Sequence, residues 1–294
     1  MAHGSGSMTH SPAGDGLRPF APPLPPDPVI TPGRRYLFKR SKRSYPDQFW
    51  GEIVAYRIGC LMGLSVPPAF VAWNSETGIS GALIEWFYRD GTEAFVMAGD
   101  FLLKVRPEFD RDRGTKHNLR DNALILRAFA KNKILRTNWR QWWVDALLFD
   151  ALIGNTDRHQ DNWGFVISSD GVYLAPLFDN GTSLGHERFP DCVGQWTERQ
   201  VNSYIAKGIH HVMWSLADTA PLRGHKALLE RTLGTWPETR SVAGERLKFC
   251  STELSDCFVD LLDFDVPVRF TAERRAFMLR LLRHRHELLR SLFE

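Results

Sequence analysis

The sequence has little cysteine, and its four cysteines form no Cys-x-x-Cys pair and have no histidine nearby at zinc-ligand spacing. This pattern gives no support to a disulfide scaffold or to a zinc finger. We expect the cysteines to be reduced and mostly buried, as in a cytoplasmic protein. Cys250 and Cys257 lie two helical turns apart, which predicts that they share one buried stripe of a helix.

Long apolar runs are missing as well. No stretch approaches the roughly 18–20 residues that a membrane-spanning helix needs, and no signal-peptide pattern opens the chain. The net charge is only +3, and the basic residues are scattered apart from a few short runs. We therefore expect a protein that binds neither a membrane nor a nucleic acid directly.

A glycine-rich phosphate-binding loop is not evident either. Residues 1–33 read as a tag-like start followed by a proline-rich arm, which we expect to be extended or disordered. The glycines available there for a phosphate loop are Gly14, Gly16 and Gly33.

The rest of the chain has the composition of a folded protein. Of its 294 residues, 43% are hydrophobic and 24% are charged, which fits one large domain or two closely packed ones. Residues 34–87 read as strand, helix, strand and strand, a small α+β unit. Residues 88–294 are mainly helical, with the helices 119–135 and 139–153 ahead of a long helical region after residue 200.

Two polar stretches flank a predicted β-hairpin in the second part. The first is GNTDRHQDN at 154–162, which follows a bulky apolar helix, and the second is LFDNGT at 177–182. Between them, Asp170-Gly171 is a strong hairpin-turn signal. Because loops at the two ends of a hairpin can meet in space, we expect these stretches to form one site for a metal and a phosphate.

The residue types in these stretches suit phosphoryl transfer. Asn162 and Asp179 offer oxygen ligands of the kind that Mg²⁺ prefers. Asp157 precedes Asn162 by five residues, so one loop can turn both side chains inward, and it can orient or deprotonate an acceptor hydroxyl. His159 lies between them, where it can contact a phosphate or steer Asp157.

The remaining phosphate contact is expected from the first unit. Lys39 ends a predicted strand, and Glu52 lies thirteen residues later on the following helix. A strand lysine paired with a helix glutamate is the arrangement with which protein kinases hold the ATP phosphates. The pair gains weight from its position upstream of the two polar loops.

These motifs resemble the C-terminal kinase domain of HipA-like proteins, which are bacterial Ser/Thr kinases. The likeness rests on GNTDRHQDN at 154–162, on FDNGTSLG at 178–185 and on EIVAYRIGCLMGLSVP at 52–67. It implies an α+β, two-lobed protein-kinase-like fold, with a small β-rich N-lobe over 34–87 and a larger, mainly helical C-lobe over 88–294.

The resemblance also implies roles for individual residues. Asp157 would be the catalytic base, and Asn162 and Asp179 would bind Mg²⁺. His159 matches the family's loop histidine, with a role in phosphate contact or loop support.

In the N-lobe, the same resemblance makes Lys39 the residue that holds the phosphates of ATP and Glu52 its partner. The adenine would be received at the hinge by Glu85, Trp86 and Phe87. The implied reaction is ATP- and Mg²⁺-dependent transfer to a Ser/Thr hydroxyl of a protein or peptide. Several members are toxins of toxin–antitoxin modules, which makes a small antitoxin-like partner possible.

Three alternatives stay open on the sequence. A lipid kinase, or a kinase of small molecules or peptides, can use the same Asp-Arg-His-x-x-Asn loop. A metal-dependent phosphoesterase would need further histidine ligands, for which the candidates show no convincing spacing. A non-catalytic pseudokinase is disfavoured by the complete set of polar residues. The histidine candidates are His186, His210, His211 and His225.

Overall fold

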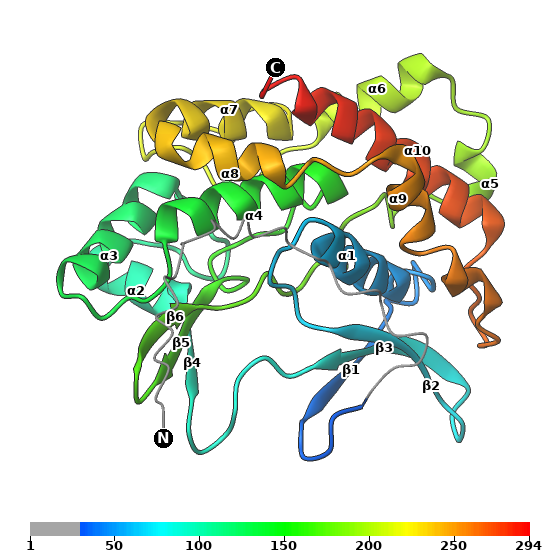
Figure 1. Cartoon of the computed structure of the whole chain (residues 1–294), viewed down its shortest axis with the longest axis horizontal. Coiled ribbons are helices and arrows are strands. Elements are labelled where there is room, and N and C mark those ends of the chain that lie inside the picture. The colour runs from blue at the N-terminus through cyan, green and yellow to red at the C-terminus, as the bar shows by residue number, and fades with distance from the viewer. Residues whose placement is uncertain (1–29) are drawn as a thin grey trace, which may run out of the picture.

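A computed structural model of the chain describes residues 30–294. Most of the expected tag-like start and proline-rich arm, residues 1–29, lies outside the described residues. Two small antiparallel sheets lie along one side of the molecule, and the long helices cover the other side (Figure 1).

The first sheet contains β1 (Tyr36–Arg40), β2 (Ala69–Asn74) and β3 (Ile79–Glu85), with β3 in the middle. Its register sets Lys39 opposite Ala82. The β2–β3 connection is closed by Asn74, whose side-chain oxygen accepts hydrogen bonds from two backbone amides of the turn. The strands thus begin and end where the sequence pattern predicts, within a few residues.

Helix α1 (Phe49–Leu61) packs on β2 and β3 and lies between this sheet and the C-terminal helices (Figure 1). This is the helix that the sequence predicted between the first two strands of residues 34–87. Its buried residues do not form one stripe, because Trp50, Val54 and Ile58 are buried together with Phe49 and Ile53. A helix that is covered on two sides buries more than one stripe.

The second sheet has the order β4 (Ala94–Met97), β5 (Gly164–Ser168) and β6 (Gly171–Leu174). The hairpin at the Asp170-Gly171 turn is confirmed. Strand β4 and the helix that follows it, α2 (Ala98–Val105), fall in a region to which the sequence assigned no element. A four-residue strand has too little pattern of its own to be recognised without its partner.

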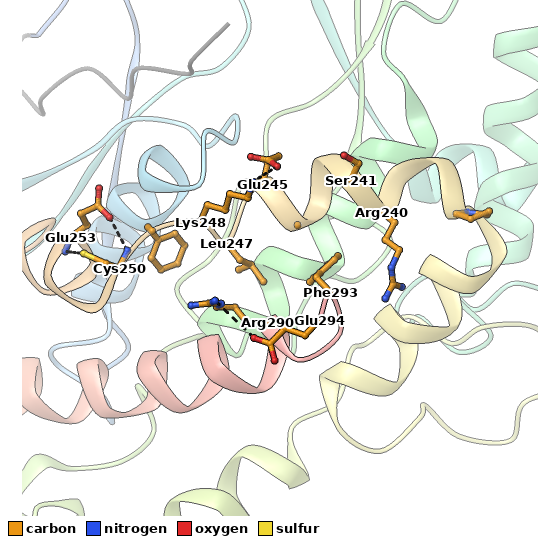
Figure 2. Close-up of a pocket in the computed structure, with 13 residues that line it drawn as sticks. Arg240, Ser241, Glu245, Leu247, Lys248, Cys250, Glu253, Arg290, Phe293 and Glu294 are labelled. Atoms are coloured by element: carbon orange, nitrogen blue, oxygen red, sulfur yellow. Dashed lines mark hydrogen bonds and ion pairs between the residues drawn. The ribbon is translucent and has the colours of Figure 1, made fainter. Parts of the chain in front are cut away.

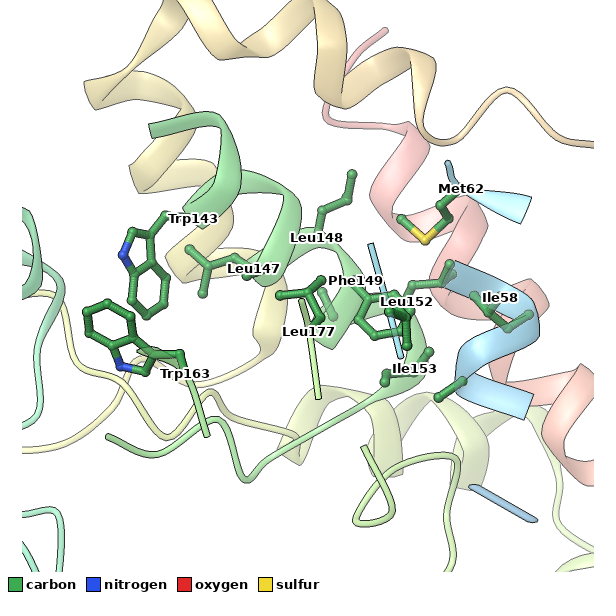
Figure 3. Packing of buried hydrophobic residues seen from close by; sticks show 14 of the residues in the cluster. Ile58, Met62, Trp143, Leu147, Leu148, Phe149, Leu152, Ile153, Trp163 and Leu177 are labelled. Atoms are coloured by element: carbon green, nitrogen blue, oxygen red, sulfur yellow. The ribbon is translucent and has the colours of Figure 1, made fainter. Parts of the chain in front are cut away.

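Helix α4 (Trp139–Ile153) is the centre of the larger lobe. In Figure 3 its residues Trp143, Leu147, Phe149 and Leu152 lie among side chains from α1 and from the segments that follow α4. Gly154 ends the helix with a left-handed φ of 70°, a conformation that glycine adopts without strain. The buried helix therefore delivers the chain directly into the polar loop.

The other helices build the outer layer of this lobe. Helix α10 packs along α4, and Thr271 caps its first turn by accepting a hydrogen bond from the amide of Arg274. No helix within residues 30–294 is long and apolar enough to cross a membrane. The remaining helical elements are α3 (Leu119–Lys131), α5 (Pro190–Val193), α6 (Glu198–Lys207), α7 (His225–Thr235), η1 (Pro237–Thr239), α8 (Arg240–Glu245), α9 (Ser251–Asp256), η2 (Asp260–Asp263) and α10 (Ala272–Arg290).

The chain thus has the predicted α+β, two-lobed architecture, whereas the prediction for the cysteines is partly wrong. All four are free, but Cys192 and Cys250 are exposed, and Cys60 and Cys257 are half-buried. Cys250 and Cys257 share no buried stripe because α9 has only six residues, so the two cysteines lie at its opposite ends. Cys250 caps the helix, where its sulfur accepts from the amide of Glu253.

Candidate active site

The polar loop after α4 is held by Asn155, which is fully buried. Its amide group donates to the carboxylate of Asp150 on α4 at 3.0 Å. Its side-chain oxygen accepts from the backbone amide of Asp157 at 3.0 Å and from the hydroxyl of Thr182 at 3.1 Å. One side chain therefore joins the helix to both polar stretches.

Arg158 makes a second and stronger link between the two stretches. Its guanidinium donates to the Asp150 carboxylate at 3.1 and 2.8 Å and to the carbonyl oxygen of Phe178 at 2.5 Å. It also reaches the side-chain oxygen of Asn180 at 2.8 Å. Arg158 was not among the residues to which the sequence motifs assigned a role. A buried arginine needs such partners. The signal for this role in the sequence was an arginine placed between two apolar elements, where burial is expected.

Asp157, Asn162 and His159 lie in one turn of this loop. The side-chain amide of Asn162 donates to the backbone carbonyl oxygen of Asp157 at 2.7 Å, which fixes the Asn162 side chain relative to the backbone at Asp157. His159 accepts through Nδ1 from the amide of Asp161 at 3.2 Å, so it supports the loop. Of the two roles considered for His159, this contact favours loop support.

Lys39 brings the N-lobe to the second polar stretch. Its ammonium group lies 2.5 Å from Oε1 of Glu52 and also pairs with the carboxylate of Asp179, which lies 140 residues further along the chain. Asp179 has a left-handed φ of 57°, a backbone conformation that is uncommon for residues other than glycine. The structure thus brings together three of the residues that the sequence singled out.

Glu52 is the buried member of this cluster, with 4% of its side chain exposed. Besides Lys39, it accepts hydrogen bonds from the backbone amides of Asn180 at 3.0 Å and Gly181 at 2.9 Å. Burial lowers the pKa of Lys39, but the carboxylates of Glu52 and Asp179 outweigh this and raise the pKa above its usual value. Lys39 is therefore a permanent cation at the centre of the site.

A pocket of about 210 Å³ opens above this cluster. Its walls carry carboxylates from both lobes together with cations from the end of β1 and the segment that follows it. Asn162 and His159 are not among the lining residues. The lining residues are Lys39, Arg40, Lys42, Gln48, Phe49, Glu52, Asp157, Asp179, Gly181 and Thr182.

The donor set fits a hard divalent cation. Asp179 and Asn162 provide oxygen atoms, and Mg²⁺ commonly takes only one or two protein ligands together with phosphate oxygens and water. Within residues 30–294, no group of three or more His, Cys, Asp or Glu side chains is placed to hold a metal by itself. A metal here would thus depend on a phosphorylated ligand for its remaining ligands.

The expected hinge lies apart from this pocket. The amide of Glu85 donates to the carbonyl of Pro68, and that of Trp86 donates to the carbonyl of Arg35, so neither is free for an adenine. The ring of Phe87 stacks on Phe178, with 5.0 Å between the ring centroids. Phe178 directly precedes Asp179, so the segment after β3 reaches the second polar stretch through this aromatic contact.

The structure gives little support to the candidate glycines for a phosphate loop or to the candidate histidines for further metal ligands. Gly33 has a positive φ of 81° with open space around it, while Gly14 and Gly16 lie outside the described residues. His210 and His225 face each other, but each donates through Nε2 to a backbone carbonyl.

A second and larger pocket, of about 920 Å³, lies on the C-lobe between α8, the start of α9 and the end of α10 (Figure 2). It contains none of the residues that the sequence singled out. Its charged side chains are largely paired with one another, as Lys248 is with Glu245 and Arg290 with Glu294.

Comparison with known proteins agrees with this geometry. The architecture, with a lysine–glutamate pair in the small lobe and two polar loops in the large one, is that of a protein-kinase-like fold. The model of one family, described as the HipA-like C-terminal domain, matches residues 27–217. The chain belongs to this family, as its loop motifs predicted.

Two known proteins show how far the likeness extends. Serine/threonine-protein kinase CtkA of Helicobacter pylori (strain J99) is 28% identical over 146 residues, which is 48% of this chain and 42% of CtkA. The chain thus matches less than half the length of this relative. The crystal structure of the proinflammatory kinase CtkA of H. pylori covers 88% of this chain and 86% of its own, with a TM-score of 0.69 and 16% identity.

A second solved structure is the HipA of Shewanella oneidensis MR-1, in complex with HipB and operator DNA. It matches with a TM-score of 0.51 and 14% identity, over 88% of this chain and 57% of that one. At these identities, both structures establish the fold alone.

Proposed function

We propose that the protein transfers the γ-phosphate of ATP to a Ser or Thr hydroxyl of a protein acceptor, with Mg²⁺ as cofactor. The observation that carries this proposal is the contact of Lys39 with Glu52 and Asp179 in a pocket that Asp157 also lines. This cluster joins both lobes. It combines the cation, the metal ligand and the base that phosphoryl transfer requires.

Each residue has a role in this reaction. Lys39 contacts the phosphates of ATP, and Glu52, held by two backbone amides, keeps the ammonium group in place. Asp157 accepts or orients the proton of the acceptor hydroxyl. Asn162 and Asp179 hold Mg²⁺, which neutralises charge on the phosphate oxygens when it is bound.

Adenine binding needs a modified assignment. The amides of Glu85 and Trp86 are occupied in the described residues, which leaves Phe87 as the hinge position with an available backbone amide. We propose that the base lies against the end of β3, near the aromatic contact of Phe87 with Phe178.

The direct test is transfer of ³²P from [γ-³²P]ATP in the presence of Mg²⁺, with the protein itself and myelin basic protein as acceptors. Phosphoamino-acid analysis then identifies the acceptor hydroxyl. We expect Asp157→Asn to lower the rate by about 10²-fold or more, because it removes the base. We expect Asp179→Asn to lower both the rate and the Mg²⁺ dependence of nucleotide binding. Asp265→Asn is the matched control, since Asp265 is exposed and pairs only with Arg269 on the surface.

The alternative functions give different results in the same experiment. Hydrolysis of a phosphoester without ATP, stimulated by Mn²⁺ or Zn²⁺, would favour a phosphoesterase. Nucleotide binding without turnover on any acceptor would favour a pseudokinase, and label in lipid or in a small molecule would change the acceptor class. Equal transfer by the wild type and Asp157→Asn would refute the assigned chemistry.

A small antitoxin-like partner is a separate proposal. Its support is the family and the fold shared with the Shewanella HipA, which was solved with HipB. Co-purification of this chain with the product of an adjacent small gene would support it, and separate elution of the two would count against it.

A further inference from the structure

The loop between α2 and α3 contacts the candidate catalytic loop through Arg111. The guanidinium of Arg111 lies 3.0 Å from the carboxylate of Asp161 and also pairs with Asp100 on α2. We propose that Arg111 is a positioning residue, which holds Asn162 in its metal-binding place through Asp161. This inference rests on the proposed function, because it assumes that Asn162 is a metal ligand.

The contact between the two loops includes backbone hydrogen bonds as well as the ion pair. The carbonyl oxygen of Arg111 accepts from the side chain of Gln160, and the carbonyl oxygen of Gln160 accepts from the amide of Gly99 at 3.0 Å. Arg111 therefore binds two successive residues of the catalytic loop, Gln160 through its backbone and Asp161 through its side chain. Gly99, at the start of α2, completes the contact.

Two glycines show how closely these segments approach. A Cβ atom on Gly99 would collide with the carboxylate of Asp161 and approach Nε of Arg111 to 2.9 Å. A Cβ atom on Gly114 would collide with the side chain of Gln160 and approach His211 to 2.7 Å. The loop over 106–117 is thus packed against the catalytic loop.

Asn162 is consequently held from two directions. From the core, Arg158 donates to the carbonyl oxygen of Asn162 at 3.2 Å. From the surface, Arg111 binds Asp161, the residue that directly precedes Asn162. The amide group of Asn162 donates to Asp157, so any shift of Asp161 would be passed to both residues. Loss of a group that orients metal ligands typically lowers metal affinity or activity by about 10- to 100-fold.

Arginine is suited to this role for two reasons. Its planar fork can bind two carboxylates at once, and lysine, with a single compact charge, cannot reproduce this geometry. The hydrogen bond to Asp161 and the pairing with Asp100 also raise the pKa of Arg111, so the charge persists at all working pH values.

The test measures Mg²⁺ binding rather than catalysis alone. The full chain is titrated with Mg²⁺ in the presence of a fluorescent, non-hydrolysable ATP analogue, and binding of the analogue is also measured in EDTA. We expect Arg111→Ala to raise the Mg²⁺ concentration at half-saturation by about 10-fold, while binding in EDTA stays unchanged. We expect Arg111→Lys to give an intermediate shift.

Arg113→Ala is the matched control. Arg113 lies in the same loop, but its side chain is 82% exposed and reaches only Asp110, at 3.9 Å. We expect Arg113→Ala to leave the Mg²⁺ concentration at half-saturation unchanged. A lower melting temperature for Arg111→Ala with unchanged half-saturation would mean that Arg111 is only structural, and would overturn the inference.

A double variant separates positioning from charge. If Arg111 acts through Asp161, then Asp161→Asn should raise the Mg²⁺ concentration at half-saturation by a similar factor. The double variant Arg111→Ala/Asp161→Asn should then show little further increase over either single variant. Recovery of wild-type behaviour in the double variant would mean that a released carboxylate causes the shift, which overturns the positioning role. Nucleotide binding by the wild type that does not respond to Mg²⁺ would instead refute the proposed function, and the inference with it.

Discussion

Arg158 donates two hydrogen bonds to the carboxylate of Asp150, at 3.1 Å from Nε and 2.8 Å from Nη2, and both side chains are excluded from solvent. The pair attaches the candidate catalytic loop to the central helix α4. Removing one partner of a buried pair leaves the other charge without compensation. We expect Asp150→Ala to lower the free energy of unfolding by about 3–5 kcal/mol, measured by urea denaturation.

The control for this prediction is a surface pair of the same chemistry. Arg140 and Glu238 lie 2.8 Å apart with nearly half of each side chain exposed. Glu238→Ala should therefore cost less than about 1 kcal/mol. A cost for Asp150→Ala as small as this would show that the buried pair does not stabilise the loop.

The close approach of Gly181 to Glu52 leads to a second prediction. A Cβ atom on Gly181 would lie 2.9 Å from Oε1 of Glu52, the oxygen that also binds Lys39. Gly181→Ala should displace this carboxylate and slow phosphoryl transfer by about 10²-fold, the usual effect of a misplacement of about 1 Å. The measurement is the initial rate of ³²P transfer at saturating ATP.

Gly51, which faces Gly181 across the same contact, is the matched control. A Cβ atom there would meet the carbonyl oxygen of Gly181 at 3.5 Å, an ordinary contact. Because Gly51 lies inside α1, Gly51→Ala should keep the rate and raise the stability by about 0.5–1 kcal/mol. Equal rates for both alanine variants would contradict the importance of the Glu52 position.

The cysteines give a third prediction, which is independent of activity. Cys192 and Cys250 are exposed, whereas burial raises the pKa of Cys257 to about 12 and also raises that of Cys60. Thiolates react and thiols do not, so iodoacetamide should modify the first two cysteines in the native protein. Mass spectrometry of the alkylated protein would reveal the order. Early modification of Cys257 would mean that the contact of α9 with its surroundings opens readily.

The sequence predicted those elements whose signals are local. Helix α4 begins after the cap at Asn138 and ends at Gly154, and the Asp170-Gly171 hairpin carries its own turn signal. The family followed from two loop motifs for the same reason, because each motif lies within nine residues. Pattern and local chemistry are sufficient for such features.

What the sequence did not predict depends on contacts between distant segments. Strand β4 forms because it pairs with β5. The backbone amide of Trp86 is occupied because it donates to the carbonyl oxygen of Arg35, the residue just before β1. The role of Arg158 could not be predicted without knowing that Asp150 and Phe178 both lie next to its loop. None of these partners has a fixed spacing in the sequence.

A fourth prediction concerns acid. Burial lowers the pKa of His210 and of His225 to about 3 each, so both are neutral in the folded protein. In the unfolded chain their pKa is about 6.5, so below that pH the unfolded state binds protons that the folded state does not. Their contribution to stability is thus complete above pH 6.5 and is lost as the pH falls toward 3, by about 1.4 kcal/mol for each histidine at pH 5.5.

The measurement is the free energy of unfolding in urea at pH 7.5 and 5.5, for the wild type and for His210→Gln/His225→Gln. Between the two pH values, the free energy of unfolding of the double variant should fall by about 2.7 kcal/mol less than that of the wild type, whatever its absolute stability. An unchanged loss would assign the acid sensitivity to other histidines.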